Sequence, residues 1–297
     1  MKKLIIVLLV LFCGIFAIEA EAAKGKDVGI CQILDVPFEP VVQVSGAFVQ
    51  SSDVEGGHGN VSLTEFEAHW AFAHFWDVLF GDVDVALRIN STIFSDSTSI
   101  DLPSELSRIA LDAGWTGRFS DGYSLQARIL PGIYNDFREF GSDALYMPVS
   151  VAVIKAFDPT LSGIFGFEVR PGFEQQIMPL IGVSWMINDK TRLDARLPES
   201  RFAYYLGRGW STHAGFCWRN MSYGIHENNL GADQATVEDF RLFLGTTFRL
   251  SDNLQFSGEV GRAFGRSIEY NDTYPGIQSK FDLEPATFVR LILGGPF

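Results

Sequence analysis

Residues 109–129 read IALDAGWTGRFSDGYSLQARI, and this stretch decides the fold. Apolar and polar side chains alternate from Ile109 onward, a turn occupies residues 120–122, and the alternation resumes at Tyr123. Alternation with a period of two is typical of a β-strand with two different faces. Strands joined by so short a turn pair antiparallel, because parallel pairing needs a crossover of a dozen or more residues. The stretch therefore predicts a β-hairpin.

The same pattern recurs along the chain, with short and long connections in alternation. The short turns are 76–81, 120–122, 158–160, 188–190, 207–209 and 251–253. The long connections lie near 51–60, 95–105, 135–145, 172–176, 223–237 and 268–284, with a tight exception at 198–200. Alternating short and long connections are typical of outer-membrane barrels, whose periplasmic turns are short and whose external loops are longer.

The first 22 residues predict a secretory signal peptide. A positive start at Lys2 and Lys3 precedes the apolar run 4–18, and the small-x-small pattern at 20–22 predicts cleavage before Ala23. An apolar run of this length is too short to span a bilayer as a helix, since spanning takes about 20 residues. A retained N-terminal anchor is the alternative. Residues 23–40 are expected to be a periplasmic segment or a plug of the barrel.

The composition of the rest of the chain favours a membrane barrel over other exported proteins. The chain is 47% hydrophobic with 26 Phe, 6 Trp and 8 Tyr, yet no run of about 18 apolar residues follows the predicted signal peptide. The formal net charge of −13 argues against nucleic acid as a partner. The sequence thus predicts an all-β, antiparallel, up-and-down transmembrane β-barrel over residues 41–297. We expect about 14 strands, or about 12 if the hairpin 191–206 does not span.

Aromatic side chains gather beside the short turns, as expected for an amphipathic ring at a membrane–water boundary. They are Phe75, Trp76, Phe80, Trp115, Phe119, Tyr123, Trp185, Tyr204, Tyr205, Trp210, Phe248 and Phe256. The alternative is a set of core aromatics of a β-sandwich, which have no reason to lie next to turns. We therefore expect outer-membrane lipids as neighbours of the barrel.

The C-terminal residues carry a resemblance to bacterial outer-membrane β-barrel proteins. The chain ends at Phe297 after the strand 288–293, and the last strand of those proteins ends in an aromatic residue that the insertion machinery recognises. Residues 294–296 (Gly-Gly-Pro) depart from that pattern. The stretch 178–200 also resembles a family of uncharacterised outer-membrane barrels. The resemblance implies the outer membrane of a Gram-negative-type bacterium and the barrel insertion machinery as a partner, and it implies no catalytic residues.

Sorting the charged residues by strand face predicts that the polar face points into a lumen, because on the lipid face each charge would cost about 2–4 kcal/mol at the midplane. The pore-lining candidates are Glu65, Glu67, His69, Asp82, Asp84, Arg88, Asp112, Arg118, Arg128, Glu168, Arg170, Arg192, Asp194, Arg196, Arg219, Arg241, Arg249 and Arg290. These charges either line a wet channel or knit together a filled interior, and the sequence leaves both hypotheses open.

Catalytic and metal-binding patterns are weak in this sequence. Glu65, Glu67 and His69 share one strand face, but their spacing of about 7 Å is too wide for one ion without other strands. Acidic residues in the long connections, among which we place Glu238 and Asp239, suit divalent cations but are also typical of solvated loops. We predict no catalytic residue, no metal and no cofactor.

Two cysteines follow the predicted signal peptide, Cys31 and Cys217. Sequence alone does not decide whether they pair.

The leading functional hypothesis is a narrow passive channel for small polar solutes. The alternative is a structural or surface-interaction barrel with a closed lumen. A membrane-lipid hydrolase is the third and weakest hypothesis, because none of the five His residues has the His-x-Ser spacing of outer-membrane phospholipases.

Overall fold

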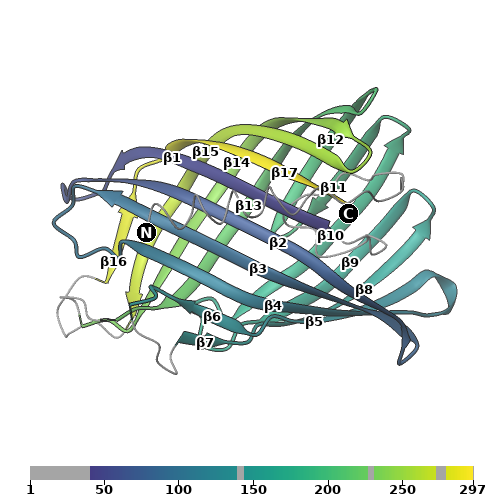
Figure 1. The fold of residues 1–297 in the computed structure, drawn as a ribbon, viewed down its shortest axis with the longest axis horizontal. Helices are drawn as coiled ribbons and strands as arrows, with labels where there is room; N and C mark the ends of the chain where they lie inside the picture. The colour runs from purple at the N-terminus through teal and green to yellow at the C-terminus, as the bar shows by residue number, and fades with distance from the viewer. Residues whose placement is uncertain (1–40, 139–143, 227–230, 272–278, 297) are drawn as a thin grey trace.

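Seventeen strand segments and one short 3-10 turn make up the computed structural model, which describes residues 41–138, 144–226, 231–271 and 279–296 (Figure 1). The segments are β1 (Val41–Asp53), β2 (Asn60–Val78), β3 (Gly81–Asp96), β4 (Glu105–Arg118), β5 (Tyr123–Ile129), β6 (Gly132–Asn135), β7 (Leu145–Tyr146), β8 (Val149–Asp158), β9 (Leu161–Val169), β10 (Ile177–Asn188), β11 (Thr191–Arg196), β12 (Glu199–Gly207), β13 (Trp210–Gly224), β14 (Gln234–Ser251), β15 (Leu254–Asn271), β16 (Lys280–Leu283) and β17 (Ala286–Pro296). No helix among these residues is long and apolar enough to cross a membrane.

Three of the strands are each split into two segments by a proline. Pro131 separates β5 from β6, Pro148 separates β7 from β8, and Pro285 separates β16 from β17. Proline interrupts a strand ladder because it has no backbone N–H to donate. The 17 segments of the described chain therefore form 14 strands, and this confirms the predicted number.

The wall is closed by its first and last strands. β1 pairs antiparallel with both β2 and β17, and Val44 lies opposite Leu293 in the closing pair. Every other strand pairs with its neighbours in the chain, as an up-and-down barrel requires. The short hairpin β11–β12 is part of the wall, since β11 pairs with β10 and β12 pairs with β13. The predicted fold class is thus confirmed.

The two ends of the barrel differ. Six tight hairpins in the described part of the chain lie at one end, which we call the short-turn end, together with the start of β1 and the end of β17 (Figure 1); the tight β11–β12 turn lies away from it, since Glu199 is opposite Cys217 in the middle of β13. The longer connections lie at the opposite end, which we call the long-connection end. Side-chain hydrogen bonds stabilise individual turns: Asp158 Oδ1 accepts from Thr160 Oγ1 (2.6 Å) and from the backbone N–H groups of Thr160 and Leu161. These bonds hold the pKa of the exposed Asp158 carboxyl below its usual range, and the bond from the Thr160 hydroxyl has the largest effect.

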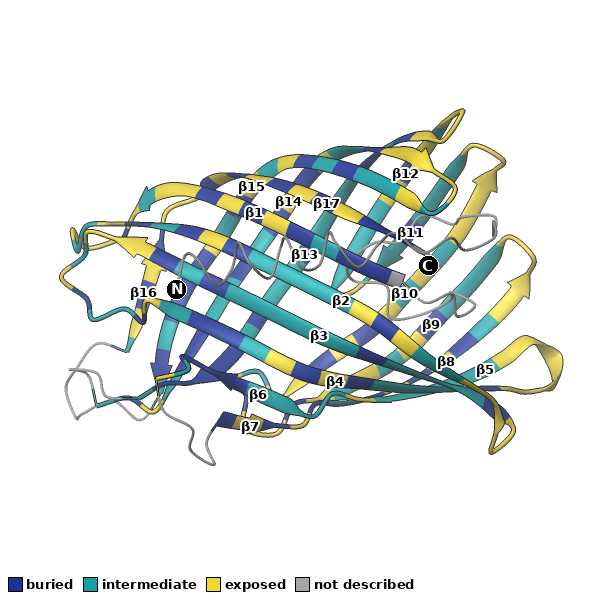
Figure 2. Ribbon diagram, viewed as in Figure 1, coloured by how far each residue is buried: buried dark blue, intermediate teal, exposed yellow. Residues whose placement is uncertain are grey.

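Burial alternates along the strands, as the sequence predicts (Figure 2). On β14, Leu242 and Leu244 are 53% and 64% exposed, whereas the alternate residues Arg241 and Phe243 are only 2% and 4% exposed. Exposed apolar side chains cover the outside of the barrel, and charged ones point inward. Aromatic side chains at the short-turn end are also exposed, with Trp76 at 64% and Phe80 at 94%. Apolar outside and polar inside is the arrangement of a barrel whose solvent is lipid.

Candidate functional site

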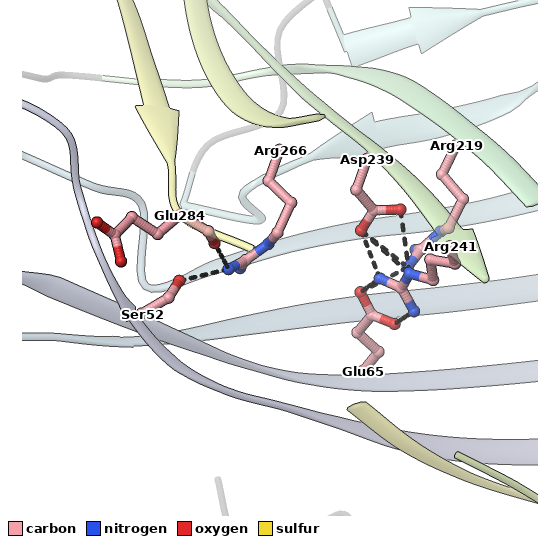
Figure 3. Close-up of polar contacts among 7 residues, drawn as sticks. All are labelled: Ser52, Glu65, Arg219, Asp239, Arg241, Arg266 and Glu284. Atoms are coloured by element: carbon pink, nitrogen blue, oxygen red, sulfur yellow. Dashed lines mark hydrogen bonds and ion pairs between the residues drawn. The ribbon is translucent and has the colours of Figure 1, made fainter. Parts of the chain in front are cut away.

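Four charged side chains meet inside the barrel and form what we call the central ion cluster: Glu65, Arg219, Asp239 and Arg241 (Figure 3). Arg241 Nη1 and Nη2 donate to the two carboxylate oxygens of Glu65 at 2.8 and 2.7 Å. Arg219 Nη1 donates to Glu65 Oε1 at 2.6 Å, and Arg241 Nη2 also donates to Asp239 Oδ2 at 2.6 Å. The cluster holds two guanidinium groups and two carboxylates, so its formal charge is balanced.

The central ion cluster crosses the lumen. Glu65 is on β2 and Arg241 is on β14, with β1, the β16/β17 strand and β15 between them along the wall. Neighbouring strands are about 4.8 Å apart, so the path along the wall between these two strands is about 19 Å. Side chains in direct contact over that separation must reach across the interior. The ion pairs therefore bridge two parts of the wall that are four strand steps apart.

Three members of the cluster are almost fully removed from solvent, and the fourth, Arg219, has a side chain that is 25% exposed. Glu65, Asp239 and Arg241 are 7%, 3% and 2% exposed. Arg241 is additionally held by the Phe288 ring, whose centroid lies 5.1 Å from its Cζ atom. Buried ions need both a partner and hydrogen bonds, because the desolvation of each ion costs several kcal/mol. The bidentate contact of Arg241 with Glu65 supplies both of these.

A second group of ions lies on the wall formed by β3, β4 and β5. Asp112 on β4 is paired with Arg88 Nε at 2.6 Å and with Arg128 Nε at 3.2 Å. The strand register places these residues side by side, since Arg128 lies opposite Gly114 and Arg88 lies opposite Ala110. One buried carboxylate is thus shared by two guanidinium groups, so this group of three side chains has one more positive than negative formal charge.

A third group lies on β12, β13, β15 and β17. Glu259 accepts hydrogen bonds from Arg290 Nε (2.7 Å) and pairs with His213 Nε2 (3.0 Å). His213 Nδ1 in turn lies 2.9 Å from Arg201 Nη2. Gly245 makes room for this group, because a Cβ atom there would lie 2.4 Å from His213 Nε2. His213 and Glu259 can therefore pack against the backbone of β14 only because residue 245 is a glycine.

Arg266 on β15 differs from the other buried arginines. Its Nη1 atom donates to Ser52 Oγ at 2.5 Å and to the Glu284 carbonyl oxygen at 3.1 Å, and both acceptors are uncharged (Figure 3). Its Nη2 atom is buried without a hydrogen-bond partner among the described residues, and the residue is 2% exposed. It lies beside the central ion cluster (Figure 3).

Apolar side chains fill the interior toward the long-connection end. They form one cluster with contributions from most of the strands, including Leu106 on β4, Tyr134 on β6 and Tyr223 on β13. The rings of Tyr134, Tyr146 and Phe173 pack edge to face, with centroids 5.0 to 5.6 Å apart. Because side chains from different parts of the wall pack together in this apolar cluster, they occupy the interior at the long-connection end.

The connection between β9 and β10 contributes to this packing by reaching to β13, β14 and β15. Arg170 Nη1 donates to the Asn220 carbonyl oxygen at 2.8 Å, and the backbone N–H of Glu174 donates to Ser222 Oγ at 3.1 Å. Asn271 Nδ2 donates to Glu174 Oε2 at 2.9 Å. The short hairpin β11–β12 lies between β10 and β13. It pairs with β13 only as far as Cys217, and the rest of β13 extends beyond it toward the long-connection end.

The structure brings many of the pore-lining candidates together, but not all of them. Glu65, Arg219 and Arg241 meet in the central ion cluster; Arg88, Asp112 and Arg128 meet on the β3–β5 wall; Arg192 and Arg196 pair with Asp194; Arg170 pairs with Glu168; Arg290 pairs with Glu259. The other candidates lie outside these groups. Glu67 accepts a hydrogen bond from Asn90, Asp84 pairs with His74, and Arg118 pairs with Asp82 at 3.7 Å near the short-turn end. His69 lies on β2, and Arg249 is exposed.

The sequence analysis missed Asp239 and Arg266. Asp239 is expected in a long external connection, but β14 begins at Gln234, so Asp239 lies within a strand and is buried. The connection ends earlier than expected because strand pairing of β13 with β14 continues to Gly224 and Gln234. Asp239 precedes Arg241 by two residues, so the period of two places both side chains on the inward face. The inward direction of Asp239 could therefore be predicted from the sequence. Arg266 follows a β-bulge opposite Asp239, which shifts the alternation and hides its inward orientation.

Metal and nucleophile sites receive no support from the geometry of the described residues. Within them, no three or more His, Cys, Asp or Glu side chains are arranged to hold a metal ion. Cys217 is buried on β13, and Cys31 lies outside the described residues, so their pairing stays untested. Glu65 and Glu67, which the sequence placed near His69, are used in separate polar contacts.

Residues 91–288 match the family described as "Domain of unknown function (DUF6268)". The chain belongs to this family. A comparison with curated proteins finds no match. The expected membership in an uncharacterised family of outer-membrane barrels is confirmed by this match together with the barrel fold.

Solved structures with a similar fold are outer-membrane barrels. The COG4313 outer membrane channel from Pseudomonas putida F1 is 10% identical, with a TM-score of 0.51 over 91% of this DUF6268 chain and 100% of that chain. The NanC porin is 8% identical with a TM-score of 0.40, covering 86% and 100% of the two chains. The translocator domain of the autotransporter NalP from Neisseria meningitidis is 10% identical with a TM-score of 0.38, covering 89% and 91%. At these identities the first match shows a shared fold.

Proposed function

We propose that this protein is an outer-membrane channel for small polar solutes that adopts a closed state in the present structure. The observation that carries the proposal is the ionic interior. Glu65, Asp239 and Arg241 are buried on the faces that point away from lipid, and they are satisfied mainly by one another across the lumen. A channel that fills with water when it opens needs such a wall. Its charged side chains then exchange their ionic partners for water molecules and keep the same number of hydrogen bonds.

A barrel that only has to be filled would gain nothing from this arrangement. Replacing a buried ion pair or triad by apolar side chains of similar volume is often neutral or stabilising. The long-connection end of the same barrel is filled in that apolar way, by residues such as Leu106, Tyr134 and Tyr223. The contrast between the apolar cluster and the central ion cluster supports a conducting role for the ionic part.

The second candidate function is a structural or surface-interaction barrel with a closed lumen. The observations that favour it are the side chains that occupy the interior at two levels, in the central ion cluster and in the apolar cluster. In that case the ion pairs contribute only to stability, and the functional groups lie in the connections at the long-connection end.

Conductance in a planar lipid bilayer separates these two functions. Discrete current steps of the purified full chain are expected for a channel, and a complete lack of steps over a range of voltages would contradict it. Arg128→Ala removes one of the two guanidinium groups that share Asp112. It should shift the permeability ratio of the channel from anions toward cations. The matched control is Arg118→Ala, which removes a mostly exposed side chain near the short-turn end.

We place the protein in the outer membrane, where the exposed apolar side chains of the wall face lipid and the aromatic ring lies at the boundary on the short-turn side. Fractionation of the membranes tests this location. A folded barrel resistant to SDS without heating and recovered with the outer membrane is the expected result. Recovery in the detergent-free soluble fraction would contradict it. The cleaved signal peptide 1–22 is a part of the same proposal, and the N-terminal residue of the purified protein tests it.

A further inference from the structure

We propose that Arg219 and Arg241 form a binding site for the carboxylate group of an anionic solute, and that Glu65 occupies this site as a tethered substitute while the barrel is closed. The inference rests on the proposed channel function and names the chemical class of its solute. Three observations carry it: the geometry around the Glu65 carboxylate, the origin of its ligands on another part of the wall, and the surplus of positive charge beside it.

The geometry around Glu65 is that of a carboxylate receptor. Arg241 presents two parallel N–H groups to the two carboxylate oxygens at 2.8 and 2.7 Å, and Arg219 adds a third donor at 2.6 Å. Such a planar fork matches a carboxylate better than it matches a spherical anion. Arg241 Nε and Nη2 donate hydrogen bonds to the Asp239 carboxylate. These bonds hold the guanidinium group in the same orientation when Glu65 is absent.

The two halves of this contact come from different walls. Arg219, Asp239 and Arg241 are on the neighbouring strands β13 and β14, whereas Glu65 reaches them from β2. The receptor is therefore complete without β2, and only its present occupant comes from across the lumen. A solute carboxylate that replaces Glu65 makes the same charge-assisted hydrogen bonds, so the exchange leaves the two guanidinium groups paired throughout.

The surroundings favour an anion. Arg266 lies beside the central ion cluster (Figure 3), and it donates hydrogen bonds to two uncharged acceptors, Ser52 Oγ and the Glu284 carbonyl oxygen. Its guanidinium group is turned toward Ser52 and the Glu284 backbone, whereas those of Arg219 and Arg241 contact the carboxylates of the cluster (Figure 3). Glu67, the next carboxylate on the inward face of β2, accepts a hydrogen bond from Asn90. Because the central ion cluster is balanced in formal charge, the guanidinium group of Arg266 is the excess charge beside it, and it favours an arriving anion over an arriving cation.

The test removes the tethered carboxylate and supplies a free one. Glu65→Ala deletes a –CH2–COO⁻ group, and acetate is the probe that replaces it. The full chain is compared in sodium acetate and in sodium chloride of equal ionic strength. One readout is the temperature at which the folded band on an unheated gel is lost. The other is acetate permeation from the reversal potential. Glu65→Ala/Arg241→Met removes the receptor, and Glu67→Ala is the matched control on the same strand face.

We expect acetate to raise the unfolding temperature of Glu65→Ala, with a half-saturating concentration at least tenfold lower than for the wild type. The double variant and Glu67→Ala should respond like the wild type. Equal responses of Glu65→Ala and Glu67→Ala, or no response of Glu65→Ala, would overturn the proposal. If Glu65→Ala folds only in acetate, the refolding yield becomes the readout: recovery in acetate but not in chloride supports the site, and failure in both overturns it.

The two proposals fail in different ways. Acetate stabilisation of Glu65→Ala without current steps in any variant would remove the channel function and keep the carboxylate site. Current steps with equal acetate permeation in the wild type, Glu65→Ala and the double variant would keep the channel and remove the site.

Discussion

The ion pair between Glu65 and Arg241 should contribute to stability as a coupled unit that spans the lumen. Arg241→Met removes five hydrogen bonds to Glu65 and Asp239. It leaves Asp239, which is 3% exposed, with Arg219 Nη1 at 4.0 Å as its remaining ion-pair partner in the central ion cluster. Removing one member of a buried ion pair costs about 3–5 kcal/mol, and we expect a loss of that size. Because Arg241 is 2% exposed, solvent screening does not reduce this figure appreciably.

The double variant Glu65→Leu/Arg241→Met should lose much less than the sum of the two single variants. Each single change leaves a buried charge without its main partner, whereas the double change removes both charges. We therefore expect a coupling free energy of about 2–3 kcal/mol, near the upper end for residues in direct contact. Arg118→Met is the control: its side chain is 72% exposed and 3.7 Å from Asp82, so its loss should cost less than about 1 kcal/mol.

The measurement is reversible urea unfolding from lipid vesicles, followed by tryptophan fluorescence. Single-variant costs that add to the cost of the double variant within about 0.5 kcal/mol would show that the two side chains do not interact. That result would refute the cross-lumen contact, and with it the closed state described above.

Three further changes test the wall, the packing and the closure. Leu244→Arg places a charge on the lipid face, where Leu244 is 64% exposed, and should cost about 2–4 kcal/mol in the same unfolding assay if it lies near the midplane. Gly261→Val puts a Cβ atom 2.1 Å from the Leu242 carbonyl oxygen, so the folded band on an unheated gel should disappear. Phe173→Ser removes a ring that packs on Tyr134 and Tyr146; it should cost about 3 kcal/mol and increase conductance, and unchanged conductance would contradict a closing role for the apolar cluster.

The barrel could be predicted from the sequence because the patterns that specify it, the alternation along each strand and the short turns, each involve only neighbouring residues. The alternation from Ile109 through the turn at 120–122 sets the two faces of β4 and β5, and in the structure Ile109 is 42% exposed while Asp112 is 4% exposed. The six short turns set the number of strands and their direction. The short hairpin β11–β12 was the uncertain element, because 6 and 9 residues are few for spanning strands. Its pairing on both sides makes it part of the wall.

The pairing of charges across the interior could not be predicted from the sequence. The inward direction of Glu65 and Arg241 follows from strand parity, but their contact joins residues 176 positions apart and depends on the shape of the closed barrel. Periodicity says which side of a strand a residue occupies and nothing about which strand lies opposite. The apolar cluster was missed for a related reason. Some of its members come from strand ends such as Tyr134 and Tyr223, where period-two patterns break down at prolines and long connections, and others, such as Phe243, lie on the inward face, which the sequence assigns to polar side chains.

The prolines that split three strands interrupt the backbone hydrogen bonds of the barrel only locally. Pro131, Pro148 and Pro285 all lie on the long-connection side, so β6, β7 and β16 are held by ladders separate from those of β5, β8 and β17. The neighbouring strands β4 and β15 are continuous past these points, since β4 pairs with both β5 and β6 and β15 pairs with both β16 and β17. A short segment at this end can therefore shift against its continuous neighbour while the ladders of β5, β8 and β17 keep the seal against lipid.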